Sequence, residues 1–129
     1  NTHLLDPQHP AHRVATAWGF RPITVVTWVK HQQGQPMVPS RKVGAYFRGA
    51  SEHVVFAVRG RLPMRAAPAT WFGTPRTKHS EKPDEFYRMV EDIAEGPYLD
   101  VFARTLRPGW SCWGNEVSDP SAPDIRVPD

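Results

Sequence analysis

The sequence predicts an α/β domain with a mostly parallel sheet and one antiparallel strand pair. Apolar, β-branched runs alternate with segments whose apolar residues recur at helical spacing, which is typical of this class. Two of the runs follow one another with no helix between them, which indicates an antiparallel pair. The 129 residues are enough for one domain that buries its own core.

The first half of the chain is expected to hold one helix and two strands. Residues 10–20 carry apolar side chains at helical spacing, and Gly19 is a natural C-terminal stop. The β-branched run 23–29 predicts a strand, and 52–59 predicts a second one. The intervening residues 31–44 are polar and contain Gly and Pro, which predicts a long loop rather than a tight hairpin.

The second half is expected to hold one helix and three short strands. A strand at 70–72 is followed by a polar, basic and turn-rich segment. A helix begins at Pro83, which suits the first helical position, and acids follow in its first turn, where the helix dipole favours them. The Gly-Pro pair at 96–97 ends this helix. Apolar runs then predict strands at 98–103 and 110–113.

We expect the domain to cover residues 1–117. Residues 118–129 combine prolines with almost no apolar side chains, which predicts a disordered tail. The chain starts with Asn-Thr-His-Leu rather than Met, as an excerpted, truncated or processed chain does. It has no signal peptide and no apolar run near the roughly 18 residues of a membrane span, so no membrane partner is expected.

Charge is distributed unevenly, although the formal net charge is only +3. Acidic residues concentrate in 84–100 and in the tail, whereas the central segment is basic. A basic segment beside an acidic helix suits a surface that meets phosphate, and ordinary solvated loops are the alternative. The basic residues of the central segment are Arg41, Lys42, Arg48, Arg59, Arg61, Arg65, Arg76, Lys78 and Lys82.

The single cysteine, Cys112, excludes an internal disulfide and a cysteine-based zinc site. Its place between Trp110 and Trp113 favours a buried structural thiol over a nucleophile. One reduced cysteine favours an intracellular, cytoplasmic protein. The six histidines show no ligand spacing, so no metal is expected.

Three polar residues stand where an α/β sheet binds ligands. Lys82 precedes the helix that begins at Pro83, and a lysine beside exposed backbone N–H groups favours an anion; a plain surface lysine is the alternative. Asp100 and Arg104 flank the end of a strand, where an acid commonly accepts hydrogen bonds from ribose hydroxyls. The alternative for this pair is a surface ion pair of little energy.

Two further groups of polar residues could bind a nucleotide. Asn115 and Glu116 follow a glycine and could hydrogen-bond the edge of an adenine ring, or Asn115 could simply cap a turn. Lys30, Arg48 and Glu52 each flank a predicted strand and could face one cleft that holds a target nucleotide. Solubility at strand ends is the alternative for these three.

Short motifs in a fixed order resemble the C-terminal half of the adenine-N6 methyltransferases related to the mRNA N6-methyladenosine writer, the MT-A family. The resemblance covers most of the chain, up to residue 117. The compact Arg-Pro-Gly-Trp at 107–110 looks like the bacterial and phage branch. The motifs occupy residues 1–4, 18–20, 28–30, 52–54, 58–60, 79–85, 102–104 and 113–116.

The resemblance implies a circularly permuted, Rossmann-like methyltransferase fold, present here in part, with S-adenosylmethionine as the cofactor. Lys82 would contact the amino-acid end of the cofactor. Asp100 and Arg104 would hold its ribose. Asn115 and Glu116 would hold its adenine, although the human writer has Gln at the second of these positions.

The same resemblance implies a nucleic acid partner, with DNA favoured over RNA. Lys30, Arg48 and Glu52 would lie nearer the target adenosine, and residues 73–82 would form a gate loop over the cofactor. The bacterial or phage branch would also make this a cytoplasmic protein.

The family's catalytic Asp-Pro-Pro-Trp (or Tyr) signature does not occur in these residues. Asp6 and Asp119 precede prolines, but neither pair continues with Pro and an aromatic residue. We therefore expect no catalytic residue in this chain, which would be inactive without a missing N-terminal segment or a complementary subunit. The alternatives are a non-catalytic, nucleic-acid-binding partner subunit and a plain nucleic-acid-binding module.

Overall fold

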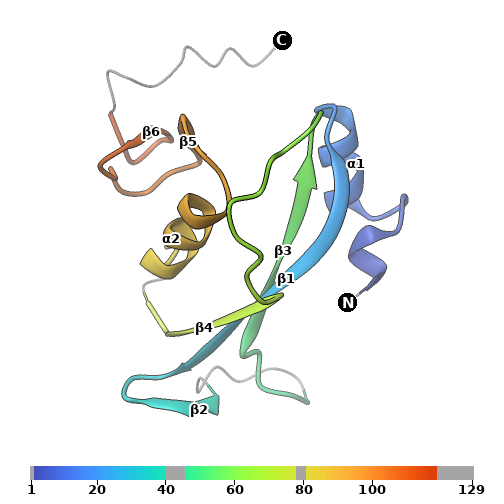
Figure 1. The fold of residues 1–129 in the computed structure, drawn as a ribbon. Coiled ribbons are helices and arrows are strands. Elements are labelled where there is room, and N and C mark those ends of the chain that lie inside the picture. The colour runs from blue at the N-terminus through green and yellow to red at the C-terminus, as the bar shows by residue number, and fades with distance from the viewer. Residues whose placement is uncertain (1, 40–45, 78–80, 119–129) are drawn as a thin grey trace. The chain divides into compact units, whose positions relative to one another are not determined.

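The structure is a computed structural model that describes residues 2–39, 46–77 and 81–118. It consists of two compact units, 1–94 and 95–129, and each is described by itself (Figure 1). The first unit contains a short 3-10 helix (Thr2–Leu5), α1 (Pro10–Ala17), β1 (Arg21–Gln32), β2 (Gln35–Pro39), β3 (Ser51–Val58), β4 (Trp71–Pro75) and α2 (Asp84–Ile93). The second contains β5 (Tyr98–Val101) and β6 (Trp110–Trp113).

Helix α1 is confirmed, with a shorter extent than the sequence predicts. The His9 ring caps it by accepting a hydrogen bond from Ala11 N at 3.2 Å, and Pro10 occupies the first turn, where its missing N–H costs nothing. Trp18 forms the C-terminal cap, and Gly19 follows with φ +80°. This left-handed conformation favours glycine and turns the chain toward β1.

The sheet of the first unit is mostly antiparallel, so the prediction of a mostly parallel sheet was wrong. β1 pairs antiparallel with β3 and with β2, and only its pairing with β4 is parallel. β3 and β4 both pair with the stretch 27–29 of β1, so they lie on its opposite edges. β1 and β2 are joined by a short turn, which reverses the chain direction and makes this pair antiparallel.

The predicted loop over 31–44 was also partly wrong. β1 continues to Gln32, and a turn containing Gly34, with φ +69°, leads into β2. Glycine is the residue that adopts this conformation without steric strain, which allows the tight hairpin. Residues 40–45 lie outside the described part of the chain.

The two helices cover opposite faces of the sheet. Val55 and Ala57 of β3 line a groove with α1, whereas Phe56, which points the other way, lines a cavity of about 180 Å³ with Met89 of α2. Because α2 buries Tyr87 and Ile93, its face of the sheet is the better covered one. The predicted α/β class is therefore confirmed as helices packed on a sheet.

The start of α2 differs by one residue from the prediction. Pro83 is the N-cap residue in an extended conformation, and the helix begins at Asp84. Asp84 also pairs with Arg88 one turn later, at 2.8 Å, on the exposed surface. Such a pair contributes only about 0.3–0.5 kcal/mol, so burial rather than charge holds this helix in place.

In the second unit, β5 and β6 form a parallel pair. Asp100 lies opposite Cys112, and the rings of Tyr98 and Trp110 stack with their centroids 4.9 Å apart. Cys112 is 1% exposed, which confirms the predicted buried thiol. β5 ends at Val101 rather than at 103, because the next residue leaves the extended region. Residues 119–129, which include most of the predicted tail, lie outside the described residues.

The centre of the first unit contains a buried polar contact that we expect to be important for stability. Trp28 Nε1 donates a hydrogen bond of 2.7 Å to Thr74 Oγ1 on β4, and Thr74 donates onward to Pro75 O. Thr74→Val would leave the indole N–H unsatisfied, so we expect the free energy of unfolding to fall by about 1–3 kcal/mol in urea titrations. Thr74→Ser keeps the hydroxyl and should lose less; equal losses would contradict this account.

Candidate functional site

The second unit contains four of the predicted cofactor residues, at or near the carboxyl ends of its two strands. Parallel pairing puts the carboxyl ends of β5 and β6 side by side, so the turns after both strands meet. Arg104 Nη2 follows β5 and lies 3.5 Å from Glu116 Oε1, which follows β6. Asn115 is exposed beside Glu116. Asp100, on β5 itself, is 5% exposed.

A close backbone approach fixes these two turns against each other. Ala103 N donates a 2.9 Å hydrogen bond to Trp113 O, and a Cβ placed on Gly114 would lie 2.3 Å from Ala103 O. Phe102 has φ 63°, an uncommon conformation for a bulky residue, and its ring meets that of Trp113 edge to face. Glycine is therefore required at 114 for the Arg104 turn and the Glu116 turn to meet.

In the first unit, two of the three residues proposed to face a target nucleotide, Lys30 and Glu52, come together. Their side chains form an ion pair between β1 and β3, and Lys30 Nζ also lies 4.2 Å from the centroid of the Trp28 ring. The Trp28 ring stacks in turn on Phe72 of β4, with 6° between the ring planes. A cation over an indole face is held electrostatically, so Lys30 has a defined position.

Sequence reasoning noted Trp28 only as a neighbour of Lys30. The structure shows that its ring supports the lysine and donates the buried hydrogen bond to Thr74. The spacing of two residues between Trp28 and Lys30 was the available signal, because such residues share a face of a strand.

Arg48 lies in the exposed segment that leads into β3. Ala50 O in this segment accepts a 2.7 Å hydrogen bond from Lys30 N, so Arg48 is two residues away from backbone that is bonded to Lys30. The structure therefore places Arg48 at the same end of the sheet as the Lys30–Glu52 pair.

Lys82 is half-buried and immediately precedes the Pro83 N-cap of α2. It belongs to the first unit, whereas the other four predicted cofactor residues belong to the second. Of the predicted gate loop over 73–82, residues 73–75 form part of β4, and 78–80 lie outside the described residues.

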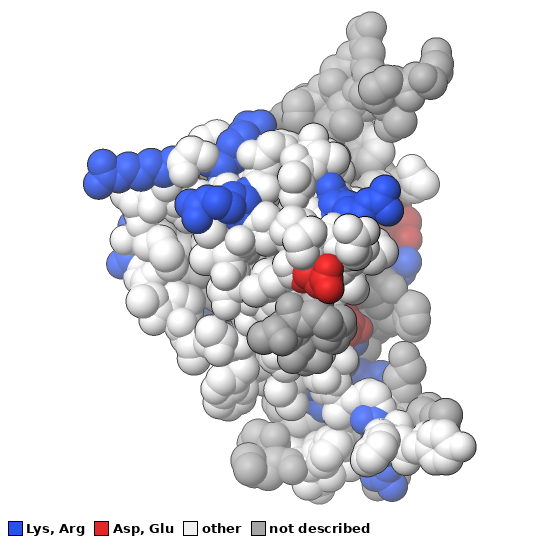
Figure 2. Space-filling model, turned by 90° about the vertical axis from the view of Figure 1, so that its right-hand side faces the viewer, with Lys and Arg blue, Asp and Glu red and all other residues white. Residues whose placement is uncertain are grey.

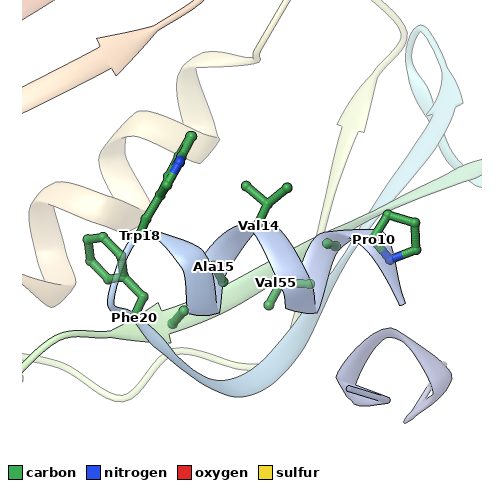
Figure 3. A pocket seen from close by; sticks show the side chains of 8 residues that line it. Pro10, Val14, Ala15, Trp18, Phe20 and Val55 are labelled. Carbon is green, nitrogen blue, oxygen red and sulfur yellow. The ribbon is translucent and has the colours of Figure 1, made fainter. Parts of the chain in front are cut away.

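A separate groove of about 520 Å³ lies between α1 and β3 (Figure 3). Val14 and Trp18 project from α1 over this groove, and they are 49% and 62% exposed. Its lining is apolar and includes none of the eight predicted site residues. The groove can therefore receive an apolar surface, but it offers no acceptor or cation to a nucleotide.

The described residues contain no group of three or more His, Cys, Asp or Glu side chains that could hold a metal ion. Over the same ranges, no helix combines the length and apolar character that crossing a membrane requires. On the face shown in Figure 2, basic side chains are more prominent than acidic ones.

The contact between the two turns of the second unit is testable by adding one methyl group. Gly114→Ala would force the backbone at Ala103 to move, so we expect a loss of about 1–3 kcal/mol in the free energy of unfolding and a changed near-ultraviolet circular dichroism spectrum from Trp113. Gly49→Ala, where an added Cβ meets nothing within 4 Å, is the matched control. Similar behaviour of the two variants would rule out the proposed close packing.

Comparison with known proteins places this arrangement in a family. A model of the family described as MT-A70 matches residues 7–116. The chain is 29% identical over 105 residues to a putative N(6)-adenosine-methyltransferase MT-A70-like protein of Medicago truncatula, which covers 78% of this chain and 17% of the relative. It is 26% identical over 105 residues to the human N(6)-adenosine-methyltransferase catalytic subunit METTL3, with 78% and 18% covered.

A shorter match with higher identity involves the human N(6)-adenine-specific methyltransferase METTL4, which is 50% identical over 44 residues. That match covers 33% of this chain and 9% of the relative. The chain thus spans less than a fifth of the length of each of these three relatives. Because the family model extends over most of the sequence, the chain belongs to the MT-A70 family.

Proposed function

We propose that this chain is the cofactor-side part of an adenine-N6 methyltransferase that acts on nucleic acid, with DNA as the substrate rather than RNA. The observation that carries the proposal is the family match over residues 7–116, which includes every predicted site residue. These residues are Lys30, Arg48, Glu52, Lys82, Asp100, Arg104, Asn115 and Glu116.

The side chains of the second unit fit S-adenosylmethionine, which supplies an electrophilic methyl group when bound. Ligands of α/β sheets bind at the carboxyl ends of strands, where Asp100, Arg104, Asn115 and Glu116 are found. The Asp100 carboxylate and the Arg104 guanidinium suit the ribose hydroxyls. Asn115 and Glu116 offer donors and acceptors to the adenine edge, and the ion pair to Glu116 also holds Arg104 in place. Lys82 suits the cofactor carboxylate.

In this proposal, the first unit holds the target nucleotide. Lys30 and Glu52 form a charged pair supported by the Trp28 ring, and Arg48 lies at the same end of the sheet. The exocyclic amine of adenine is a poor nucleophile because its lone pair is delocalised into the ring. The base must also leave its stack to be reached. A charged pair of fixed position can orient such an extruded nucleotide by hydrogen bonds.

Another polypeptide segment must supply the catalytic acceptor and the stacking ring. The sequence contains no Asp-Pro-Pro followed by an aromatic residue. The chain also spans less than a fifth of the relatives it matches, so a longer polypeptide or a complementary subunit can supply that segment. We therefore propose that the chain transfers no methyl group by itself.

Two observations support DNA as the substrate. The compact Arg-Pro-Gly-Trp at 107–110 looks like the bacterial and phage branch of the family. The 44-residue match of 50% identity is to a relative whose name specifies adenine rather than adenosine. The bacterial or phage branch and a cytoplasmic location remain part of this proposal.

A second candidate function is a non-catalytic partner subunit that holds nucleic acid. The absence of the Asp-Pro-Pro-aromatic sequence favours it. The two proposals differ in the cofactor, because a partner subunit that only holds nucleic acid needs no S-adenosylmethionine. Cofactor binding therefore decides between them.

We expect the chain to bind S-adenosylmethionine in isothermal titration calorimetry. Asp100→Asn keeps the shape of a buried side chain and removes its charge, so the affinity should fall about tenfold to a hundredfold. Asn115→Ala should weaken binding in the same direction. Glu95→Gln, which is exposed and outside the proposed site, is the control. Absence of cofactor binding by the unmodified protein would favour the partner subunit.

Transfer itself is tested with radiolabelled cofactor and adenine-containing DNA and RNA oligonucleotides. The chain alone is expected to leave N6-methyladenine at background, because it lacks the acceptor for the amine hydrogens. The positive control adds a segment of another family member that contains Asp-Pro-Pro-Trp, and methyl transfer is expected in that mixture. Label incorporated by the chain alone would contradict the proposal that catalysis needs a further segment.

A further inference from the structure

Two aromatic side chains in the first unit are almost fully exposed. Tyr46 is 96% and Phe47 is 88% exposed, more than any other large hydrophobic residue among those the structure describes. Adjacent exposed rings are costly to hydrate, and such side chains usually mark a surface that binds a partner. Neither residue belongs to the sites discussed above.

The segment that carries these rings is bonded to one end of the sheet. They lie in the segment that enters β3, at the end of the sheet near β2 in Figure 1. Ala50 O, three residues after Phe47, accepts the 2.7 Å hydrogen bond from Lys30 N. The aromatic pair is thereby tied to the strand that carries the Lys30–Glu52 pair.

Two exposed arginines accompany the rings. Arg48 is the next residue in the chain, and Arg76 N donates a 3.1 Å hydrogen bond to His31 O, directly after Lys30 on β1. The rings and Arg48 therefore lie at the same end of the sheet as Arg76, which is on the opposite edge of β1.

This combination matches the chemistry of an unpaired nucleic acid strand. Aromatic rings stack on exposed bases, and arginines neutralise the backbone phosphates. A duplex offers no free base face to Tyr46 and Phe47, because its bases are stacked on each other. Protein partners also use exposed Tyr and Phe. The neighbouring Arg48, with Arg76 at the same end of the sheet, favours nucleic acid.

We propose that Tyr46 and Phe47 form a stacking platform for unpaired nucleotides beside the target adenine, with Arg48 and Arg76 on the flanking phosphates. The location beside the target rests on the proposed function, since that function places Lys30 and Glu52 near the target. The binding chemistry of the platform is independent of the cofactor and of methyl transfer.

The test is fluorescence anisotropy with the 129-residue chain and a labelled, unstructured single-stranded DNA of about 12 nucleotides. Tyr46→Ala/Phe47→Ala should weaken binding about tenfold or more while the slope of log affinity against log salt stays unchanged, because stacking and not charge is lost. Arg48→Ala and Arg76→Ala should each reduce that slope by about one.

Two matched variants separate stacking from general loss of apolar surface. Tyr46→Phe/Phe47→Tyr keeps both rings and should keep the affinity. Trp18→Ala removes an exposed ring from the C-terminal cap of α1, where it is 62% exposed, and should leave binding unchanged. Far-ultraviolet circular dichroism checks that all variants retain the fold, which is expected because the changed side chains are exposed.

Three outcomes overturn the platform: unchanged affinity of the double alanine variant, tighter binding of a duplex of the same sequence, and no binding of the single strand by the unmodified chain. Aromatic-dependent binding without any affinity for S-adenosylmethionine would leave the platform in place and remove the proposed methyltransferase function. Binding of S-adenosylmethionine with no contribution of the rings to the affinity for single-stranded DNA would remove the platform and leave the proposed methyltransferase function in place.

Discussion

The first unit depends on the pairing of β1 along both of its edges. β3 and β4 meet it over residues 27–29, so this stretch has neighbours on both sides. Its tryptophan, Trp28, stacks on Phe72, donates to Thr74 and supports Lys30. A single buried indole thus links the core of the sheet to the charged pair proposed to face the substrate. A shift of β4 would displace Lys30 directly, because the Trp28 ring contacts both.

The second unit uses a different constraint, which is close approach of backbone rather than burial of a large side chain. Gly114 allows the turn after β6 to touch Ala103, and Phe102 adopts an uncommon conformation to bring the chain there. This geometry joins Arg104 and Glu116 from two strands into one ion pair. An exposed ion pair contributes little to stability, so the close backbone approach rather than this pair holds the two turns together.

We propose a separate role for each of the two units. Charged and amide groups at the ends of β5 and β6 suit a nucleoside, whereas the sheet of the first unit presents Lys30, Glu52, Arg48 and exposed rings. The family model that matches this chain extends over both groups of residues. The Asp-Pro-Pro-aromatic sequence does not occur in these residues, and our proposal assigns the catalytic acceptor to another segment.

The sequence by itself determined the family, both helices and the apolar strands, because these follow from local periodicity and from short motifs. It failed on the direction of the sheet and on the hairpin after His31, since strand pairing is set by contacts between distant residues and a polar strand gives no apolar signal. Only the tertiary structure decided that Lys30 pairs with Glu52 and that Arg104 meets Glu116. The physical reason is that both contacts require strands remote in sequence to lie in one register.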